Sequence, residues 1–299
     1  MKSFTFKLSI VLVFMICNYT MMAQNTSDTA KESDTNEKSY FSLGINFIND
    51  AVYLGRKDSI SAPYLYPQLT YYNKSGFYVM GSFSYLTKSS QSRIDLFLGT
   101  LGYEFTSDKF RGDLSLTKYF FNDESYNVIS EVEADLTASA GYDFEVIDLA
   151  VSFTTFFNNS SSSDFFLSSE ISHNFLNDNG DFQISPTIGI FFGSQNFYEE
   201  YYINNRFGSG RGQGTGSGQG SAGSTTTSST VVMNESEKFG LMALEFSAPV
   251  WYVVKPFTFL FLPVYVIPQN PATLTVDSTV YEEDLENTFY WMVGVSYKF

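Results

Sequence analysis

The chain has 299 residues and a formal net charge of −15, with 32 acidic residues against 17 lysines and arginines. This acidic balance argues against nucleic acid as a partner, because no basic surface is left to meet phosphates. The sequence also combines 31 Phe and 21 Tyr with only 16% charged residues, which is unusual for a soluble acidic protein.

The first residues have the pattern of a secretory signal peptide. Lys2 and Lys7 precede an apolar run from Leu8 to Cys17 that is too short to span a bilayer, and cleavage is expected after Ala23. Ile16 is larger than the small residue that a lipoprotein signal needs before its cysteine, so ordinary secretion is favoured.

Removal of this signal peptide (residues 1–23) takes away two lysines and no acid, which gives a mature net charge of −15 − 2 = −17. It also removes the only cysteine, so the mature chain has no disulfide. Residues 24–38 are small, charged and free of aromatics, and they predict a disordered polar leader.

From Tyr40 onward, apolar residues recur at every second position in a series of segments. Successive side chains of a strand point to opposite faces, so each segment has one apolar face and one small or polar face. The last segment is the clearest, because Phe289, Trp291, Val293, Val295, Tyr297 and Phe299 share one face. Strands are predicted at 39–49, 62–73, 76–86, 92–105, 109–121, 125–142, 146–157, 164–175, 181–197, 236–253, 256–267 and 287–299.

The connections between these segments alternate between tight turns and mostly longer loops. The longer or more irregular ones are 50–61, 122–124, 158–163, 198–235 and 268–286. Short turns at one end, longer loops at the other and an even strand count are typical of outer-membrane barrels. The Gly/Ser-rich tract at 208–230 falls in one of the long connections, so 198–235 is expected to be a flexible extracellular loop.

A soluble β-sandwich also alternates, and three observations favour lipid over a protein core. The segments are longer than usual strands, their polar faces carry small residues rather than Lys and Glu, and the chain ends in an aromatic strand. We therefore predict an all-β fold, a transmembrane antiparallel up-and-down β-barrel of about 12 strands spanning 39–299, in the cell outer membrane. Outer-membrane lipid and lipopolysaccharide are its expected surroundings.

The terminal strand also resembles the signal read by the barrel-assembly machinery of Gram-negative bacteria, with Trp291, Tyr297 and Phe299 as its aromatic residues. A further resemblance lies at 52–85. This stretch is similar to the first hairpin region of TorF-type porins, and the matching positions are Tyr53, Gly55, Pro63, Pro67, Ser75, Gly76, Phe77 and Tyr78. The segment 93–99 is similar to the fourth strand of that family, whereas Leu54 departs from its usual arginine. The resemblance implies an outer-membrane barrel with a role in transport, without a named substrate.

Side-chain parity gives an acidic lumen. The predicted pore-lining residues are Arg93, Asp95, Arg111, Asp113, Glu131, Glu133, Asp135, Glu170 and Glu245, with Lys298 as a third base. Seven acids against three bases predict weak cation selectivity in a narrow channel for small polar solutes. The alternative is that these charges form a structural plug, because twelve strands lie between filled and open barrels. Pairing about 122–124 would place Arg111 opposite Asp135 and Asp113 opposite Glu133.

The sequence does not predict an enzyme, a cofactor or a metal site. Its single histidine, His173, has outward parity beside Ile171 and Phe175, without a serine two residues away on that face. One histidine and no mature cysteine leave no zinc site. A surface-interaction role through the 198–235 loop stays open. Lys118 has lipid-facing parity, which indicates either a position near the outer rim or a bulge.

Overall fold

The computed structural model describes residues 38–58, 61–88, 91–122, 125–127, 129–158, 162–196, 231–234, 237–276 and 279–299. The predicted signal peptide, almost all of the predicted leader and most of the 198–235 loop lie outside these residues. Within them, no helix has the length and apolar character needed to cross a membrane.

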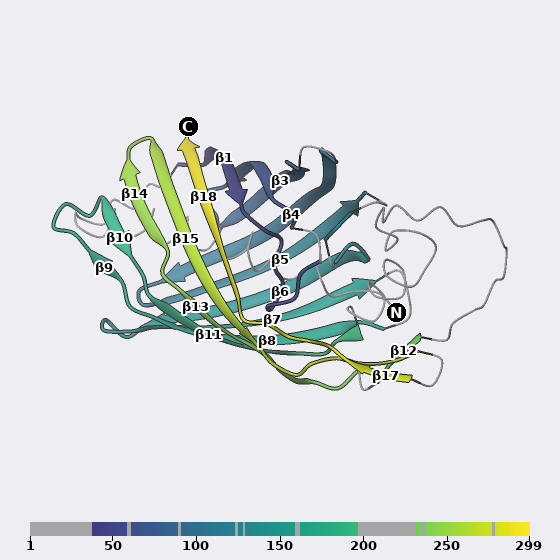
Figure 1. Ribbon diagram of the computed structural model, residues 1–299. Coiled ribbons are helices and arrows are strands. Elements are labelled where there is room, and N and C mark those ends of the chain that lie inside the picture. The colour runs from purple at the N-terminus through teal and green to yellow at the C-terminus, as the bar shows by residue number, and fades with distance from the viewer. Residues whose placement is uncertain are drawn as a thin grey trace.

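The described chain is built from antiparallel strands (Figure 1). The first eight are β1 (Tyr40–Ile48), β2 (Tyr64–Tyr72), β3 (Phe77–Leu86), β4 (Arg93–Ser107), β5 (Phe110–Phe121), β6 (Val132–Asp143), β7 (Asp148–Asn158) and β8 (Asp164–Ser172). The later strands of the same sheet are β9 (Phe175–Leu176), β10 (Phe182–Ile184), β11 (Thr187–Gly193), β13 (Gly240–Ser247), β14 (Val250–Val254), β15 (Phe257–Pro268) and β18 (Thr288–Lys298). A separate three-stranded sheet contains β12 (Val231–Asn234), β16 (Thr273–Val276) and β17 (Thr279–Glu282).

The large sheet closes on itself. β1 pairs with both β2 and β18, and β13 pairs with β15 as well as with β11. In three places two consecutive strands form one interrupted strand of the barrel wall: β8 with β9, β10 with β11, and β13 with β14. The fifteen strands therefore form 15 − 3 = 12 full-length strands of the wall, which we call staves. The prediction of a closed twelve-stranded antiparallel barrel is confirmed.

The two ends of the barrel differ. Short turns at 73–76, 108–109, 144–147, 177–181 and 255–256 share one end with the start of β1 and the end of β18, and we call it the short-turn end. The opposite end carries the longer connections, and we call it the long-loop end. In Figure 1 the small sheet with β12 and β17 lies beyond this second end.

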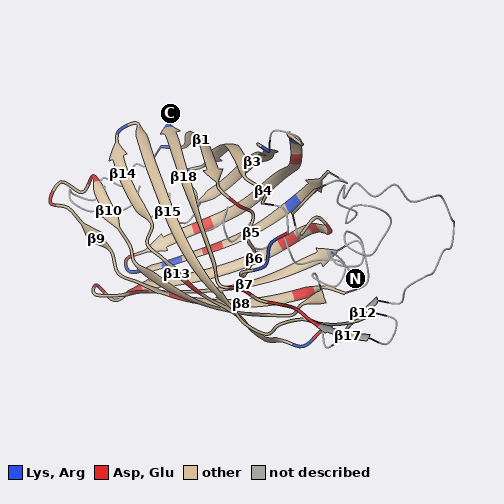
Figure 2. Ribbon diagram, in the orientation of Figure 1, with Lys and Arg blue, Asp and Glu red and all other residues tan. Residues whose placement is uncertain are grey.

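The outer face of the barrel is apolar and exposed. Phe77 is 56% exposed, and the same pattern recurs on every long strand, for example at Leu43, Leu69, Phe97, Leu101, Leu114, Leu116, Phe153, Phe165, Ile188, Phe261 and Phe289. Figure 2 shows few charged residues along the staves. A continuous apolar exterior of this kind is unfavourable in water and suits contact with hydrocarbon.

Three neighbouring staves are interrupted side by side. The amide of His173 donates to the carbonyl of Pro186 (3.2 Å), that of Ser185 to Pro249 (3.0 Å) and that of Ala248 to Pro263 (3.4 Å). Proline has no N–H group, so the regular ladder cannot continue through these positions. The interruption divides three of the predicted strands, at 164–175, 181–197 and 236–253, into two pieces each.

The predicted register between the fifth and sixth strands is wrong. Arg111 lies opposite Gly141 and Asp113 opposite Ser139, whereas Asp135 pairs with Thr117. The physical reason is a longer connection. The amide of Ser130 donates to Asn127 (3.0 Å) and that of Val132 to Ile129 (3.1 Å), so the chain turns twice before β6 begins at Val132 rather than near residue 125.

Candidate functional site: the barrel lumen

The lumen has two chemically different halves. The apolar half lies toward the long-loop end and contains the buried side chains of Ile48, Tyr64, Leu86, Leu96, Val132, Phe156, Val264, Val266, Tyr290 and Met292. The polar half lies toward the short-turn end and contains Ser42, Gln68, Thr70, Ser82, Thr100, Ser115, Thr137, Ser139, Ser152, Thr258 and Ser296. Buried exceptions in the polar half are Tyr78, Met80, Trp251 and Leu260, and buried acids in the apolar half include Asp95 and Asp164.

Residues 52–56, between β1 and β2, fold into the apolar half, and we call them the plug segment. Val52, Tyr53 and Leu54 are buried among the apolar side chains. The segment is a tight turn in which the amides and carbonyls of Tyr53 and Arg56 bond to each other at 2.6 and 2.7 Å. Burial, with the charges of Asp164 and Glu245, raises the pKa of Tyr53 well above its usual value, so its phenol stays protonated.

The plug segment is fastened to the loop that precedes β18. The Arg56 side chain is 0% exposed, and its Nη2 forms an ion pair with Glu283 (3.2 Å) and donates to the carbonyl of Asn270 (2.9 Å). Gly55 has a φ of 81°, and a Cβ atom there would lie 2.6 Å from Cβ of Pro268. Only glycine fits this position, because it tolerates the left-handed backbone and leaves room for the proline ring.

Three of the sequence-predicted lumen carboxylates are hydrogen-bonded to tyrosines of nearby strands. Tyr64 donates to Asp95, Tyr78 to Asp113 (3.0 Å) and Tyr119 to Asp135. Asp95 also accepts from Arg93 (2.8 Å) and Ser125 (2.6 Å), and Asp135 accepts from Thr137 (2.9 Å). These aspartates are therefore held in the barrel wall by their own hydrogen bonds.

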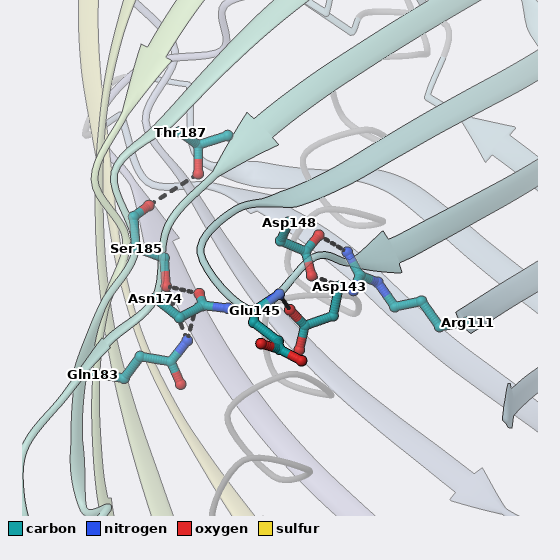
Figure 3. A network of polar contacts seen from close by, with 8 residues as sticks. All are labelled: Arg111, Asp143, Glu145, Asp148, Asn174, Gln183, Ser185 and Thr187. Atoms are coloured by element: carbon teal, nitrogen blue, oxygen red, sulfur yellow. Dashed lines mark hydrogen bonds and ion pairs between the residues drawn. The ribbon is translucent and has the colours of Figure 1, made fainter. Parts of the chain in front are cut away.

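Arg111 forms a two-pronged ion pair with Asp148 across the intervening strand β6 (Figure 3). The crossing needs Gly141, because a Cβ atom there would lie 2.6 Å from Cζ of Arg111. Sequence parity missed this partner, because it placed Asp135 rather than Asp148 opposite Arg111. Nearby in the turn, Asp143 accepts from the amide of Glu145 (2.6 Å), and the Lys109 ammonium lowers the pKa of Glu145.

A cluster of neutral polar groups lies at the interruption of the wall (Figure 3). Gln183 donates to Asn174 (3.1 Å) and to Ser185 (2.9 Å), and Ser185 donates to Asn174 (2.5 Å). Thr187 donates to the carbonyl of Ser185 at 2.9 Å. These bonds join the broken staves where the backbone ladder is missing.

Glu170 and Glu245 differ from the other lumen acids. They lie in one row of the sheet, because Gly189 of β11 is the register partner of Glu170 on one side and of Glu245 on the other. Glu170 is half-buried. Glu245 is only 3% exposed, and no donor among the described residues reaches either of its carboxylate oxygens.

The remaining predicted residues lie near the rims. The prediction that Glu133 faces inward is wrong: a bulge between Val132 and Ala134 turns it outward, where it pairs with Lys118 (3.0 Å). The bulge therefore places a carboxylate beside the outward-facing lysine. Glu131 precedes β6 and is half-buried, and Lys298 lies 3.9 Å from the ring centre of Tyr40 at the short-turn end.

His173 bonds the carbonyl of Val146 through Nδ1 and packs edge-on against Phe175. Among the described residues, no group of three or more His, Cys, Asp or Glu side chains could hold a metal ion.

No protein-family model matches the chain, and no curated protein matches its sequence. The TorF-type resemblance therefore stays a prediction. Among solved structures, the chain is similar to the NanC porin, with 9% identity, a TM-score of 0.46 and coverage of 86% of this chain and 98% of that one. The KdgM porin gives 10% identity, a TM-score of 0.44 and coverage of 86% and 99%.

LpxR from Salmonella typhimurium gives 9% identity, a TM-score of 0.41 and coverage of 86% and 99%. The strand pairing of this chain itself shows the closed barrel.

Proposed function

We propose that this protein is an outer-membrane barrel with a porin-like role, whose polar half admits small polar solutes and whose apolar half is closed by the plug segment. The exposed apolar exterior supports a membrane location. The first strand, β1, begins at the short-turn end and the last strand, β18, ends there. In bacterial outer-membrane barrels the end with the short turns faces the periplasm. The long-loop end then faces the outside of the cell.

One observation carries the proposal: the lumen is packed in one half and partly open to water in the other. Leu262, Val266 and Met292 are fully buried toward the outside. Toward the periplasm, Ser139, Ser152, Ser168, Glu170 and Ser247 are only half-buried, so water reaches their side chains. Passage across the whole barrel therefore requires the plug segment to move, whereas entry from the periplasm does not.

Conductance in planar bilayers tests this proposal. The wild-type barrel is expected to conduct poorly. A variant that lacks residues 52–55 is expected to conduct, with cations preferred over anions, because the remaining lumen carries Glu170 and Glu245. The Lys57→Ala variant is the control, since Lys57 is an exposed cation directly after the plug segment. Anion preference in the open variant would contradict an acidic pathway.

The alternative is a closed barrel with a structural or surface-interaction role, and the packing of the apolar half favours it. A folded 52–55 deletion variant that conducts no better than wild type would support this alternative.

Lipopolysaccharide and the barrel-assembly machinery are the partners that we propose in either case. Trp291, Tyr297 and Phe299 would form the assembly signal, and their position on β18 and just after it supports this role.

A further inference from the structure

Glu245 poses a chemical problem that the barrel itself does not resolve. An ionised carboxylate away from water is strongly unfavourable unless a positive charge or hydrogen-bond donors compensate it. Asp95, Asp135 and Asp148 each have donors at hydrogen-bonding distance. Glu245 has none among the described residues, although it is as deeply buried as Asp95 and Asp135.

Glu245 lies close to a second carboxyl group and to an aromatic ring. Gly189, which lies between the two glutamates in the sheet, has no side chain to separate them. The ring of Phe191 covers this glycine, since a Cβ atom there would lie 2.7 Å from the ring and 3.6 Å from Cγ of Glu170. Two carboxyl groups and one aromatic ring therefore meet above a position without a side chain. The charge of Glu170 acts directly on Glu245.

Water reaches this group of side chains from one side. Glu170 is half-buried, and so are Ser168 and Ser247 near it, so this part of the polar half is accessible. The Arg111–Asp148 pair lies within electrostatic range of Glu170, but its two charges neutralise each other. Three carboxyl groups share one guanidinium, so Glu170 and Glu245 have no cation of their own in this group.

The ligand class follows from these groups. Ca²⁺ and Mg²⁺ prefer six or more oxygen ligands, and the described residues hold no group of three or more His, Cys, Asp or Glu side chains that could bind a metal ion. An ammonium group needs fewer partners, is attracted to carboxylates and also interacts favourably with the face of an aromatic ring. We propose that Glu170 and Glu245 bind a small organic ammonium ion from the periplasmic side, with Phe191 against its carbon atoms.

This inference deepens the proposed function, because it names what the polar half binds. Titration calorimetry on the intact detergent-solubilised barrel tests it with ethylammonium chloride as the probe, at constant ionic strength. Ethanol serves as the uncharged probe of similar size. Saturable binding of ethylammonium alone is expected. Glu245→Gln should weaken it about tenfold or more, which corresponds to about 1.4 kcal/mol, and Glu170→Gln should weaken it less.

The control variant is Asp178→Asn, which removes one negative charge from an exposed turn at the same end of the barrel. It should bind ethylammonium like wild type. Folding of each variant is checked by circular dichroism, and Glu170→Gln provides the test should Glu245→Gln not fold. Equal binding of ethanol, or binding unchanged by either glutamine variant, would overturn the site. Binding that persists while the 52–55 deletion variant stays closed would uphold the site and remove the passage function.

Discussion

The two halves of the lumen are made by the same twelve staves and the same alternation of side chains, yet one is filled and the other is not. The difference is the size of the inward residues. Leu, Met, Phe and Tyr fill most of the half toward the long loops, whereas Ser and Thr leave room in the half toward the short turns. Strand number alone therefore does not determine whether a barrel of intermediate size is open.

The largest expected effect comes from breaking the fastening of the plug segment. Arg56→Ala leaves the carboxylate of Glu283 buried without its partner, and loss of one member of a buried ion pair costs about 3–5 kcal/mol. Urea unfolding in lipid vesicles measures the loss. The neighbouring Lys57→Ala variant should be unchanged, and an equal loss in both variants would mean that the ion pair does not hold the segment.

The packing of the apolar half gives the second effect. Leu262→Ala removes a fully buried side chain and should cost about 2–5 kcal/mol of unfolding free energy. Leu116→Ala, on the exposed outer face, removes the same atoms without creating an internal cavity. Comparison of the two urea midpoints tests whether this half is as tightly packed as a protein core. Equal midpoints would indicate a loosely filled lumen.

Loss of a tyrosine hydroxyl that donates to a buried aspartate should lower the unfolding free energy by a smaller amount. Tyr119→Phe removes the hydroxyl that donates to the buried Asp135, at a cost of about 1–3 kcal/mol. Tyr265→Phe is the matched control, because Tyr265 lies on the exposed outer face. Thermal unfolding of both variants, followed by circular dichroism, distinguishes a structural aspartate from one that is free to attract ions.

The smallest effect is expected at the turn that joins β6 and β7. Lys109 lowers the pKa of Glu145, so this pair adds stability above the ordinary pKa of the carboxyl group, and the contribution is lost as the pH falls through the lowered value. Both side chains are exposed, and solvent screens the attraction. Glu145→Gln should therefore leave the thermal midpoint at neutral pH unchanged within error, and a clear decrease would contradict this interpretation.

Much of the barrel could be predicted from the sequence, because period-2 alternation directly reports which face of a strand meets the exterior. The strands beginning near Tyr40, Phe77 and Thr288 start within two residues of their predicted positions. The register between β5 and β6 could not be predicted from the sequence, because it depends on the turns that precede β6 rather than on alternation. The bulge at Glu133 has the same origin: one extra residue reverses parity without changing composition.

The state of the lumen was harder to predict than its charge. Side-chain parity predicts which carboxylates face the lumen. It does not reveal that Tyr64 and Tyr119 donate hydrogen bonds to two of them, because these tyrosines come from other strands. The sequence pattern predicts only a connection at the plug segment, although the apolar run from Ala51 to Leu54 is a usable signal for burial. Hydrogen bonds across strands and inserted loops depend on tertiary geometry, which a single sequence pattern does not encode.

The pairing of β1 with β18 has a consequence for biogenesis. The amide of Phe299 donates to the carbonyl of Phe41 (2.9 Å). One edge of β1 can therefore form its native strand pairing only after β18 has been synthesised. Before that pairing, this edge of β1 exposes unpaired backbone N–H and C=O groups. Such an edge can pair with a strand of another chain and lead to aggregation. Closure of the barrel brings together the first and last strands of the sheet, and this edge of β1 has no strand partner until then.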